Sequence, residues 1–246
     1  MCLLLLAPAG LRAQQLELLY NRHAAYHSAD ANGQVHGLLV DRINLALQST
    51  AIHAVWREVP VARQREELRG NEQAACVVGA LKTPDRVGLG KFSAPFYRAL
   101  PIIAVSRADN PRMVSGRPLR VTLEDPQLTL LAKDGYTFGA FVTAQIERSR
   151  PKTMRTLTEV PNMVAMLGGK RADYMFMAED AFAPLVHSLG YPPGRFKITR
   201  FSDMPEGNER YLWCSLRVPD AMLAQLNRAF ARLPAQEPAR RQLSGR

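Results

Sequence analysis

The sequence lacks an apolar run long enough to cross a bilayer. Its most apolar stretch, residues 1–13, is shorter than the roughly 20 residues that a membrane-spanning helix needs. Hydrophobic residues nevertheless make up 47% of the 246 positions. That share excludes a largely disordered chain and is sufficient for one large domain, or for two lobes that each have a core.

Cysteine is scarce, with three residues in the chain. Cys2 is not preceded by the small residues of a lipid-attachment site, so we do not expect an anchor there. Cys76 and Cys214 each lie in a β-like run, and in an oxidising compartment such a pair is more often bonded than free. Two isolated cysteines without neighbouring histidines make a poor metal site, so we predict neither a metal nor a cofactor.

Clustered basic charge is also missing, although the chain is basic overall. The 32 Lys and Arg outnumber the 22 Asp and Glu, which gives a formal net charge of +10. The arginines are scattered singly, and aromatic residues do not alternate with them as a base-stacking groove requires. We therefore predict no nucleic-acid partner.

Signatures of catalysis are weak. No serine stands in a G-x-S-x-G setting, and the five histidines are dispersed. His23 and His27 are four residues apart, but they lie in a predicted loop where helical ligand spacing has little meaning. An enzyme built on this chain would need a cleft carboxylate with a raised pKa, for which Glu58, Glu179 and Asp180 are candidates.

Residues 1–13 have the character of a signal peptide. The apolar run ends in Leu11-Arg12-Ala13, and a small residue before Gln14 suits a signal-peptidase cut. The usual basic n-region is absent, so we expect either a start codon assigned too late or a signal that begins upstream. The mature protein is predicted to begin near Gln14 and to be exported to the periplasm.

The rest of the chain alternates between strand and helix patterns in two successive series. A first series is followed by the linker-like segment 107–111, a second series, and then a final strand and helix. The predicted strands are 16–20, 54–59, 76–79, 119–123, 128–132, 154–157, 173–177, 196–201 and 211–215, and the predicted helices are 38–47, 62–68, 140–147, 158–167, 178–189 and 219–233.

This order predicts an α/β protein with two lobes, each a mainly parallel sheet flanked by helices. Residues 14–105 and 206–246 are expected to form lobe 1, and residues 106–205 lobe 2. The chain would then cross between the lobes twice and form a hinge. The cleft between hinged lobes is a natural ligand site.

The most informative stretch runs from Cys76 to Arg86 and on to Phe92-Ser-Ala-Pro-Phe96. A buried strand ends at Gly79 and opens into a polar loop, which is where open α/β sheets usually bind ligands. The Arg86 guanidinium could donate two parallel hydrogen bonds to a carboxylate. An ordinary surface arginine on a turn is an equal alternative from the spacing alone.

Several of these motifs together resemble the family 3 extracellular solute-binding proteins, which have the type II periplasmic binding protein fold of amino-acid receptors. The resemblance covers nearly all of the mature chain. The resemblance rests on these motifs: Gly33-x3-Gly37, Gly79 with Thr83-Pro-Asp-Arg86, Phe92-Ser-Ala-Pro-Phe96, Lys133-Asp-Gly-Tyr-Thr-Phe-Gly139 and Arg171-Ala-Asp-Tyr-Met. It implies that the Gly79 backbone faces the ligand, that Arg86 grips a carboxylate, and that Cys76 and Cys214 lie on neighbouring strands.

Other ligand contacts are implied by position in the same family. The resemblance places Tyr20 and Tyr26 at an aromatic wall, although ordinary packing is an equal alternative, and Leu81 where amino-acid binders often carry a hydroxyl. Lys133 could add a charge, and Gly135 and Thr137 are expected to open a helix and donate to an anion. Glu179 or Asp180 would meet the ammonium group of an amino acid, although neither stands at the usual offset.

The sequence therefore predicts a monomeric periplasmic binding protein. It would capture a small, carboxylate-bearing, amino-acid-like solute between its lobes and present it to an ABC permease or a membrane sensor. The alternatives are a cleft enzyme of the dehydratase type on the same fold, and a receptor that has lost transport.

Overall fold

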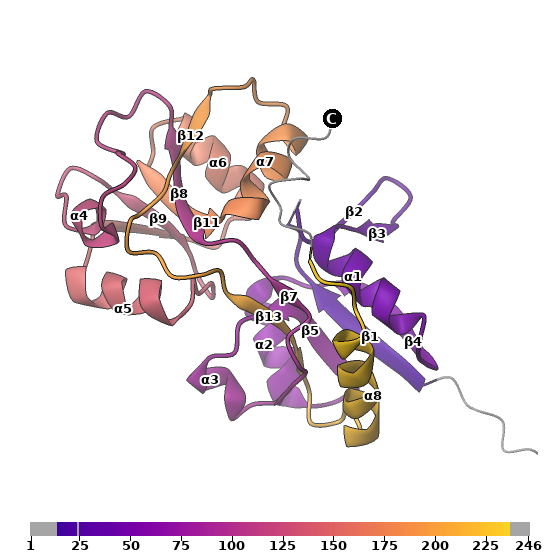
Figure 1. The fold of residues 1–246 in the computed structure, drawn as a ribbon. Coiled ribbons are helices and arrows are strands. Elements are labelled where there is room, and N and C mark those ends of the chain that lie inside the picture. Colours follow the sequence, from indigo (N-terminus) through magenta and orange to yellow (C-terminus); the bar gives the residue numbers. More distant parts are fainter. Residues whose placement is uncertain (1–13, 24, 237–246) are drawn as a thin grey trace, which may run out of the picture.

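The computed structural model describes residues 14–23 and 25–236, and the predicted signal peptide at 1–13 lies outside these residues. Two sheets flanked by helices form two lobes (Figure 1). The first sheet has the order β4-β1-β5-β13-β6, and β7 also pairs with β13. Its strands are β1 (Gln14–Tyr20), β4 (Ile52–Glu58), β5 (Ala75–Ala80), β6 (Lys91–Phe92), β7 (Tyr97–Arg98) and β13 (Glu209–Cys214).

The first lobe is built on a parallel core. Strand β1 pairs in parallel with β4 and β5, and β13 returns antiparallel to β5. Helix α1 (Leu38–Leu47) covers the sheet because its apolar residues recur at helical spacing, with Leu39, Val40, Ile43 and Ala46 buried. The other elements of this lobe are β2 (Ser28–Ala29), β3 (Val35–His36), α1 (Leu38–Leu47), α2 (Val61–Gly70), α3 (Pro84–Val87) and α8 (Asp220–Ala231).

The second lobe has a sheet of order β10-β9-β11-β8-β12. Strand β11 pairs in parallel with β9 and antiparallel with β8, and all five of its residues are buried. Its elements are β8 (Ile102–Arg107), α4 (Leu119–Leu123), β9 (Leu130–Lys133), α5 (Ala140–Ser149), β10 (Thr153–Thr156), α6 (Val160–Gly168), β11 (Tyr174–Ala178), α7 (Glu179–Ser188) and β12 (Phe196–Thr199).

The chain passes between the two sheets twice. The first crossing lies between Arg98 at the end of β7 and Ile102 at the start of β8, and the second lies between β12 and β13. The expected change of lobe at 105–106 falls inside β8, whose residues pair with β11 and β12 of the second sheet. Nothing in the sequence indicates a crossing before Ile102, because the apolar run that begins at Ala99 continues without a break into β8.

The prediction of a strand at 119–123 is wrong, because these residues form helix α4. Leu119, Thr122 and Leu123 are buried while Val121 is 41% exposed. That spacing of i, i+3 and i+4 is helical, and Pro118 precedes the first turn. A run of five residues is too short for periodicity to separate the two structures.

The predicted disulfide between Cys76 and Cys214 is confirmed. The two cysteines are directly opposite in the antiparallel register of β5 and β13, and both are fully buried. The bond therefore fixes the returning strand of the first lobe beside the strand that ends at the predicted ligand loop.

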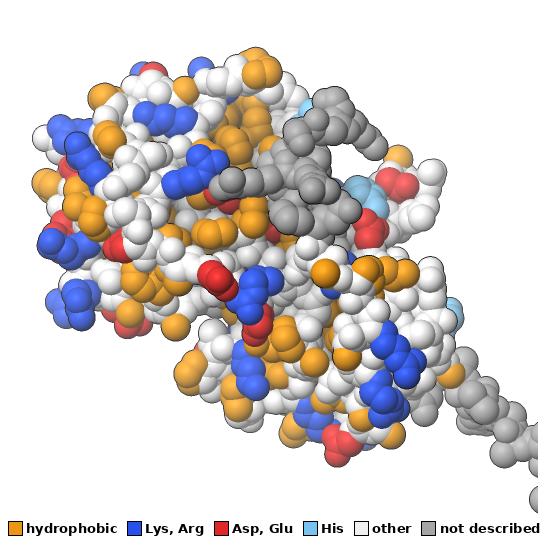
Figure 2. Space-filling model, viewed as in Figure 1, with side chains coloured by type: hydrophobic (Ala, Val, Ile, Leu, Met, Phe, Trp, Pro, Cys, Tyr) orange, Lys and Arg blue, Asp and Glu red, His pale blue; other side chains and the backbone are white. Residues whose placement is uncertain are grey.

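Within residues 14–23 and 25–236, none of the helices has the length and apolar character to cross a membrane. Basic side chains are spread over both lobes on the face that Figure 2 shows, and they alternate with apolar and acidic ones.

Candidate functional site

A cavity of about 130 Å³ lies between the lobes, where the C-terminal ends of β5 and β11 approach each other. The first lobe contributes the loop after β1, the end of β5, and Arg210 of β13. The second lobe contributes the loop after β9 together with side chains of α6 and β11. An engineered cavity of about 150 Å³ holds a benzene molecule, so a space of this order suits a small solute.

Arg86 lines the cavity from the short helix α3. Its Nη1 donates to the Leu81 carbonyl at 3.1 Å, and its guanidinium lies 5.3 Å from the ring centroid of Trp213. Burial lowers the pKa of Arg86, while the neighbouring Asp85 carboxylate acts in the opposite direction. The structure thus places Arg86 in the cavity wall, where its remaining donors are available to an anion.

Gly79 lies at the end of β5 in a left-handed conformation, with φ of 74°. A Cβ atom at this position would lie 2.5 Å from Cδ1 of Leu39, so a larger residue would push that side chain aside and strain the backbone. Gly79 and Leu81 both line the cavity as expected from the sequence. Whether a ligand touches them stays a prediction.

Arg210 is a cavity residue that the sequence reasoning missed. Its Nη1 donates to the Gly79 carbonyl at 3.4 Å, its guanidinium lies 5.4 Å from the Tyr26 ring centroid, and its Nε is buried without a hydrogen-bond partner. The sequence could have pointed to Arg210 only through its place in the last strand. If that strand pairs with β5, its side chains lie near the loop that follows β5. A second guanidinium therefore stands beside Arg86.

Two histidines from the loop after β1 complete this wall. Burial, the neighbouring His27 and the positive charge of Arg210 lower the pKa of His23 to about 3. Burial also lowers the pKa of His27 to about 4, and Arg210 adds to this effect. Both imidazoles are neutral at pH 7. Nowhere in the described part of the chain do three His, Cys, Asp or Glu gather as a metal site.

Asp180 ties the two lobes together instead of facing the cavity. It is buried at the first turn of α7, and it accepts hydrogen bonds from the hydroxyls of Tyr26, at 2.9 Å, and of Tyr97. Both tyrosines belong to the first lobe, so we call these three residues the tyrosine latch. Tyr26 also lines the cavity, which leaves its ring available to a ligand.

Two other predicted contacts lie outside the cavity. Glu179 accepts hydrogen bonds from Nε and Nη2 of Arg200, at 2.9 and 2.6 Å. Tyr20 is buried at the end of β1, where it packs against His27 and Trp56. Glu179 and Asp180 were the residues expected to meet an ammonium group, but the residue before them, Ala178 at the end of β11, lines the cavity in their place.

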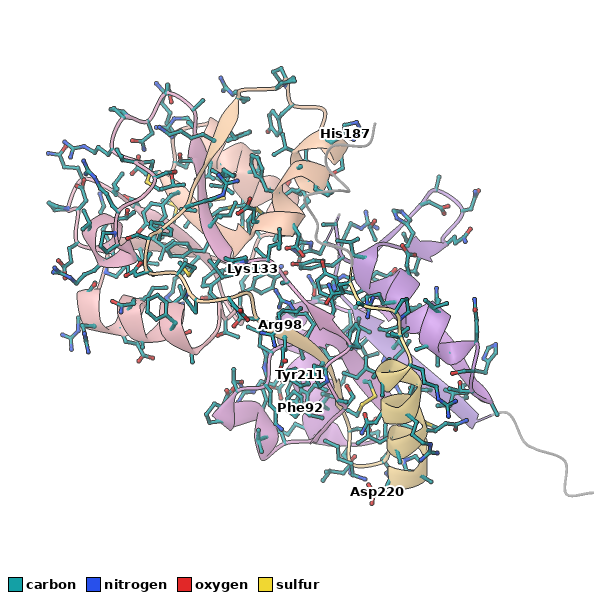
Figure 3. The ribbon with its side chains drawn as sticks, viewed as in Figure 1. Phe92, Arg98, Lys133, His187, Tyr211 and Asp220 are labelled. Carbon is teal, nitrogen blue, oxygen red and sulfur yellow. A yellow bond between two sulfur atoms is a disulfide. The ribbon has the colours of Figure 1, made fainter. Side chains whose placement is uncertain are left out.

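Lys133 lines the cavity at the end of β9, close to the junction of the lobes (Figure 3). It is 5% exposed, and its Nζ lies 2.5 Å from Oε2 of Glu159 in an orientation that does not form a hydrogen bond. The contact is therefore ionic, and the Tyr136 ring lies 5.0 Å from the same ammonium. The positive charge of Lys133 has a partner, whereas Arg86 and Arg210 form no ion pair with any other described residue.

The segment after Lys133 lines the cavity but does not open a helix. Gly135 and Thr137 precede α5, which begins at Ala140, so the expectation of a helix N-terminus at 135–137 is wrong. Between them, the Tyr136 hydroxyl accepts a hydrogen bond from Nδ2 of Asn21 at 2.8 Å. This bond is a second polar link between the lobes.

The remainder of the second-lobe wall is apolar. Strand β11 ends here, and the helix α6 and the loop before α5 complete the surface. The side chains concerned are those of Phe138, Val160, Met163, Met175, Phe176 and Met177.

A wider groove of about 860 Å³ adjoins the cavity and shares Arg86 with it. Its acidic residues include Asp85 and Glu209, whose carboxylates lie 2.8 Å from Arg65 and 2.6 Å from Arg98 respectively. These two acids are therefore already paired with arginines of the groove.

Comparison with known proteins identifies the fold. No protein-family model matches the chain, and a search of curated proteins finds no match. Among solved structures, an ancestral arginine-binding protein bound to arginine matches over 88% of this chain and 91% of its own, with 16% identity and a TM-score of 0.70. A periplasmic binding protein of Salmonella typhimurium with high arginine specificity matches over 89% and 93%, with 17% identity and a TM-score of 0.68.

A third match is the substrate-binding protein of an ABC uptake transporter from Streptococcus pneumoniae, solved with bound histidine. It covers 88% of this chain and 85% of its own, with 14% identity and a TM-score of 0.69. The chain therefore has the α/β, two-lobed fold of periplasmic binding proteins. At these identities the likeness concerns the fold, and the ligands named belong to those proteins.

Proposed function

We propose that this protein is a solute-binding protein of the family 3 type, which closes its two lobes over a small carboxylate-bearing solute. The observation that carries the proposal is the cavity itself, which both lobes line and which contains the guanidinium groups of Arg86 and Arg210. Two crossings of the chain give the lobes a hinge. Guanidinium groups bind carboxylates with paired, charge-assisted hydrogen bonds.

Each cavity residue has a role in this proposal. Arg86 and Arg210 hold the carboxylate, the Gly79 and Leu81 backbone shapes the pocket, and Tyr26 provides an aromatic face. Lys133, Gly135 and Thr137 close the opposite side. Tyr20 and Glu179 act only through contacts within their own lobes, and Asp180 acts through contacts between the lobes. The protein would act as a monomer in the periplasm and present its solute to an ABC permease or a membrane sensor.

Catalysis is the less favoured function. The acids considered as possible catalysts are engaged elsewhere: Glu58 pairs with Arg22 at 3.2 Å, Glu179 with Arg200, and Asp180 with its two tyrosines. Within the described part of the chain, no Asp or Glu lines the cavity. A dehydratase would need a carboxyl group facing its substrate.

The proposal is tested by a thermal-shift screen against amino acids, polyamines, and mono- and dicarboxylates, followed by calorimetry on the hits. A ligand bound by the native state alone raises the melting temperature. Arg86→Ala should weaken binding of a hit at least about tenfold, because it removes a charged hydrogen-bond donor.

Arg120→Ala is the matched control, since this arginine is exposed on α4 and pairs with Glu124. It should bind the hit as the natural protein does. If Arg86→Ala also binds the hit with unchanged affinity, the proposed carboxylate site is wrong.

A further inference from the structure

We propose that the ligand is an organic acid that has an apolar body and no ammonium group, such as a 2-oxo acid. This inference rests on the proposed function and concerns the charge balance of the same cavity. It separates this protein from a receptor for ordinary amino acids, each of which carries a carboxylate and an ammonium group on the same carbon.

Two arginines that form no ion pair with another described residue lie at one end of the cavity. Arg210 donates to the Gly79 carbonyl and Arg86 to the Leu81 carbonyl, and these carbonyls are two residues apart at the end of β5. One carboxylate, together with an oxygen on the adjacent carbon, can accept hydrogen bonds from both guanidinium groups. The buried Nε of Arg210, which has no partner, adds another available donor.

An ammonium group would find no carboxylate partner among the described residues that line the cavity. Glu179 and Asp180 follow β11, but the first pairs with Arg200 and the second is held by the hydroxyls of Tyr26 and Tyr97. Ala178 lines the cavity at the end of that strand, and none of the described lining residues is acidic. Burying a cation beside two arginines without a carboxylate is strongly unfavourable.

The other polar groups do not change this balance. His23 and His27 are held neutral, and the carboxylate of Glu159 lies against the ammonium of Lys133. The opposite wall is made of methionine and phenylalanine side chains from β11, α6 and the loop before α5, with Phe138, Met163 and Met177 among them. Such a surface suits an aliphatic or aromatic body, and methionine adapts readily to irregular shapes.

The test compares pairs of ligands that differ at one carbon. Calorimetry would measure L-leucine against 4-methyl-2-oxopentanoate, and L-phenylalanine against phenylpyruvate, on the natural protein. In at least one pair the 2-oxo acid should bind more than about tenfold tighter than its amino acid, because the ammonium loses its hydration without gaining a partner.

A substitution in the cavity should reverse the preference. Ala178→Asp places a carboxylate at the end of β11 and should strengthen binding of the amino acid while weakening that of the 2-oxo acid. Ala178→Asn is the matched control, because it adds similar volume without charge and should not favour the amino acid. Circular dichroism of both variants shows whether each is folded. If either variant is unfolded, the calorimetry of the two ligand pairs on the natural protein is the test.

The outcomes separate the two proposals. If in both pairs the amino acid binds the natural protein as tightly as its 2-oxo acid, through Arg86, the present inference is overturned while the solute-binding function stands. If no amino acid, 2-oxo acid or other carboxylate binds at millimolar concentration, both proposals are overturned.

Discussion

His27 is 5% exposed in the cavity wall, beside a permanently charged arginine. Its neutral form leaves the charges of Arg86 and Arg210 to an incoming anion. The sequence located Arg86 because a glycine, a turn and an arginine follow one another within a single loop. It could not locate Arg210 or the histidines, since only the pairing of β13 with β5 and the folding of the loop after β1 bring them to the same place.

These histidines predict a pH dependence of stability. The unfolded chain binds a proton at each histidine near pH 6.5, whereas the folded chain does so near pH 3 for His23 and pH 4 for His27. Since the unfolded state binds more protons in this window, the free energy of unfolding should fall as pH drops from about 6.5 to about 4, by a few kcal/mol.

Urea denaturation of the natural protein and of His27→Gln between pH 7 and pH 4 would measure this contribution. The variant should lose less stability over that range, because one of the two titrating groups is gone. His53→Gln is the control, since His53 lies exposed on β4. Parallel stability curves for the natural protein and His27→Gln would contradict the prediction.

At the scale of elements, β5 and β13 determine the site. One strand ends at Gly79, the other carries Arg210, and the disulfide between Cys76 and Cys214 holds them in register. The longer helices were predictable because their apolar positions repeat over about ten residues, as in α1. Helix α4 was not predictable, because it has five residues and the burial of Leu119 and Leu123 fits a strand as well as a helix.

Replacing both cysteines with serine should lower the free energy of unfolding by about 2–5 kcal/mol, because the bond closes a long loop of chain. The loop spans a sequence separation of 138 residues. Chemical denaturation of Cys76→Ser/Cys214→Ser against the natural protein would measure the loss. Adding reductant to the natural protein under native conditions should have little effect, since both sulfur atoms are buried. Equal stability of the two proteins would show that the bond contributes nothing.

At the scale of the whole molecule, polar contacts hold the lobes against each other around the cavity. Asp180 accepts from Tyr26 and Tyr97, and Asn21 donates to Tyr136 across the same gap. The division into two lobes was predictable from the sequence, because a second β/α series is complete before the final strand and helix rejoin the first lobe. The contacts between lobes did not follow from it, because they depend on the angle at which the lobes meet.

Asp180→Ala should therefore loosen the closed arrangement. It removes the acceptor of two tyrosine hydroxyls, and a buried donor without a partner costs about 1–3 kcal/mol. Small-angle scattering without ligand should give a larger radius of gyration than for the natural protein, and the melting temperature should fall. Glu124→Ala, at an exposed acid of the second lobe, is the control. An unchanged radius would mean that the latch does not hold the lobes closed.

The antiparallel return of β13 also sets the order in which the molecule can be completed during synthesis. Residues 102–199 contain every strand of the second sheet, so that lobe can form as soon as it leaves the ribosome. The first sheet cannot be completed until later, because β13 lies between β5 and β6 and is synthesised after the whole second lobe. A translation arrest before residue 209 would thus leave an assembled second lobe attached to an unfinished first one, with Cys76 still a free thiol.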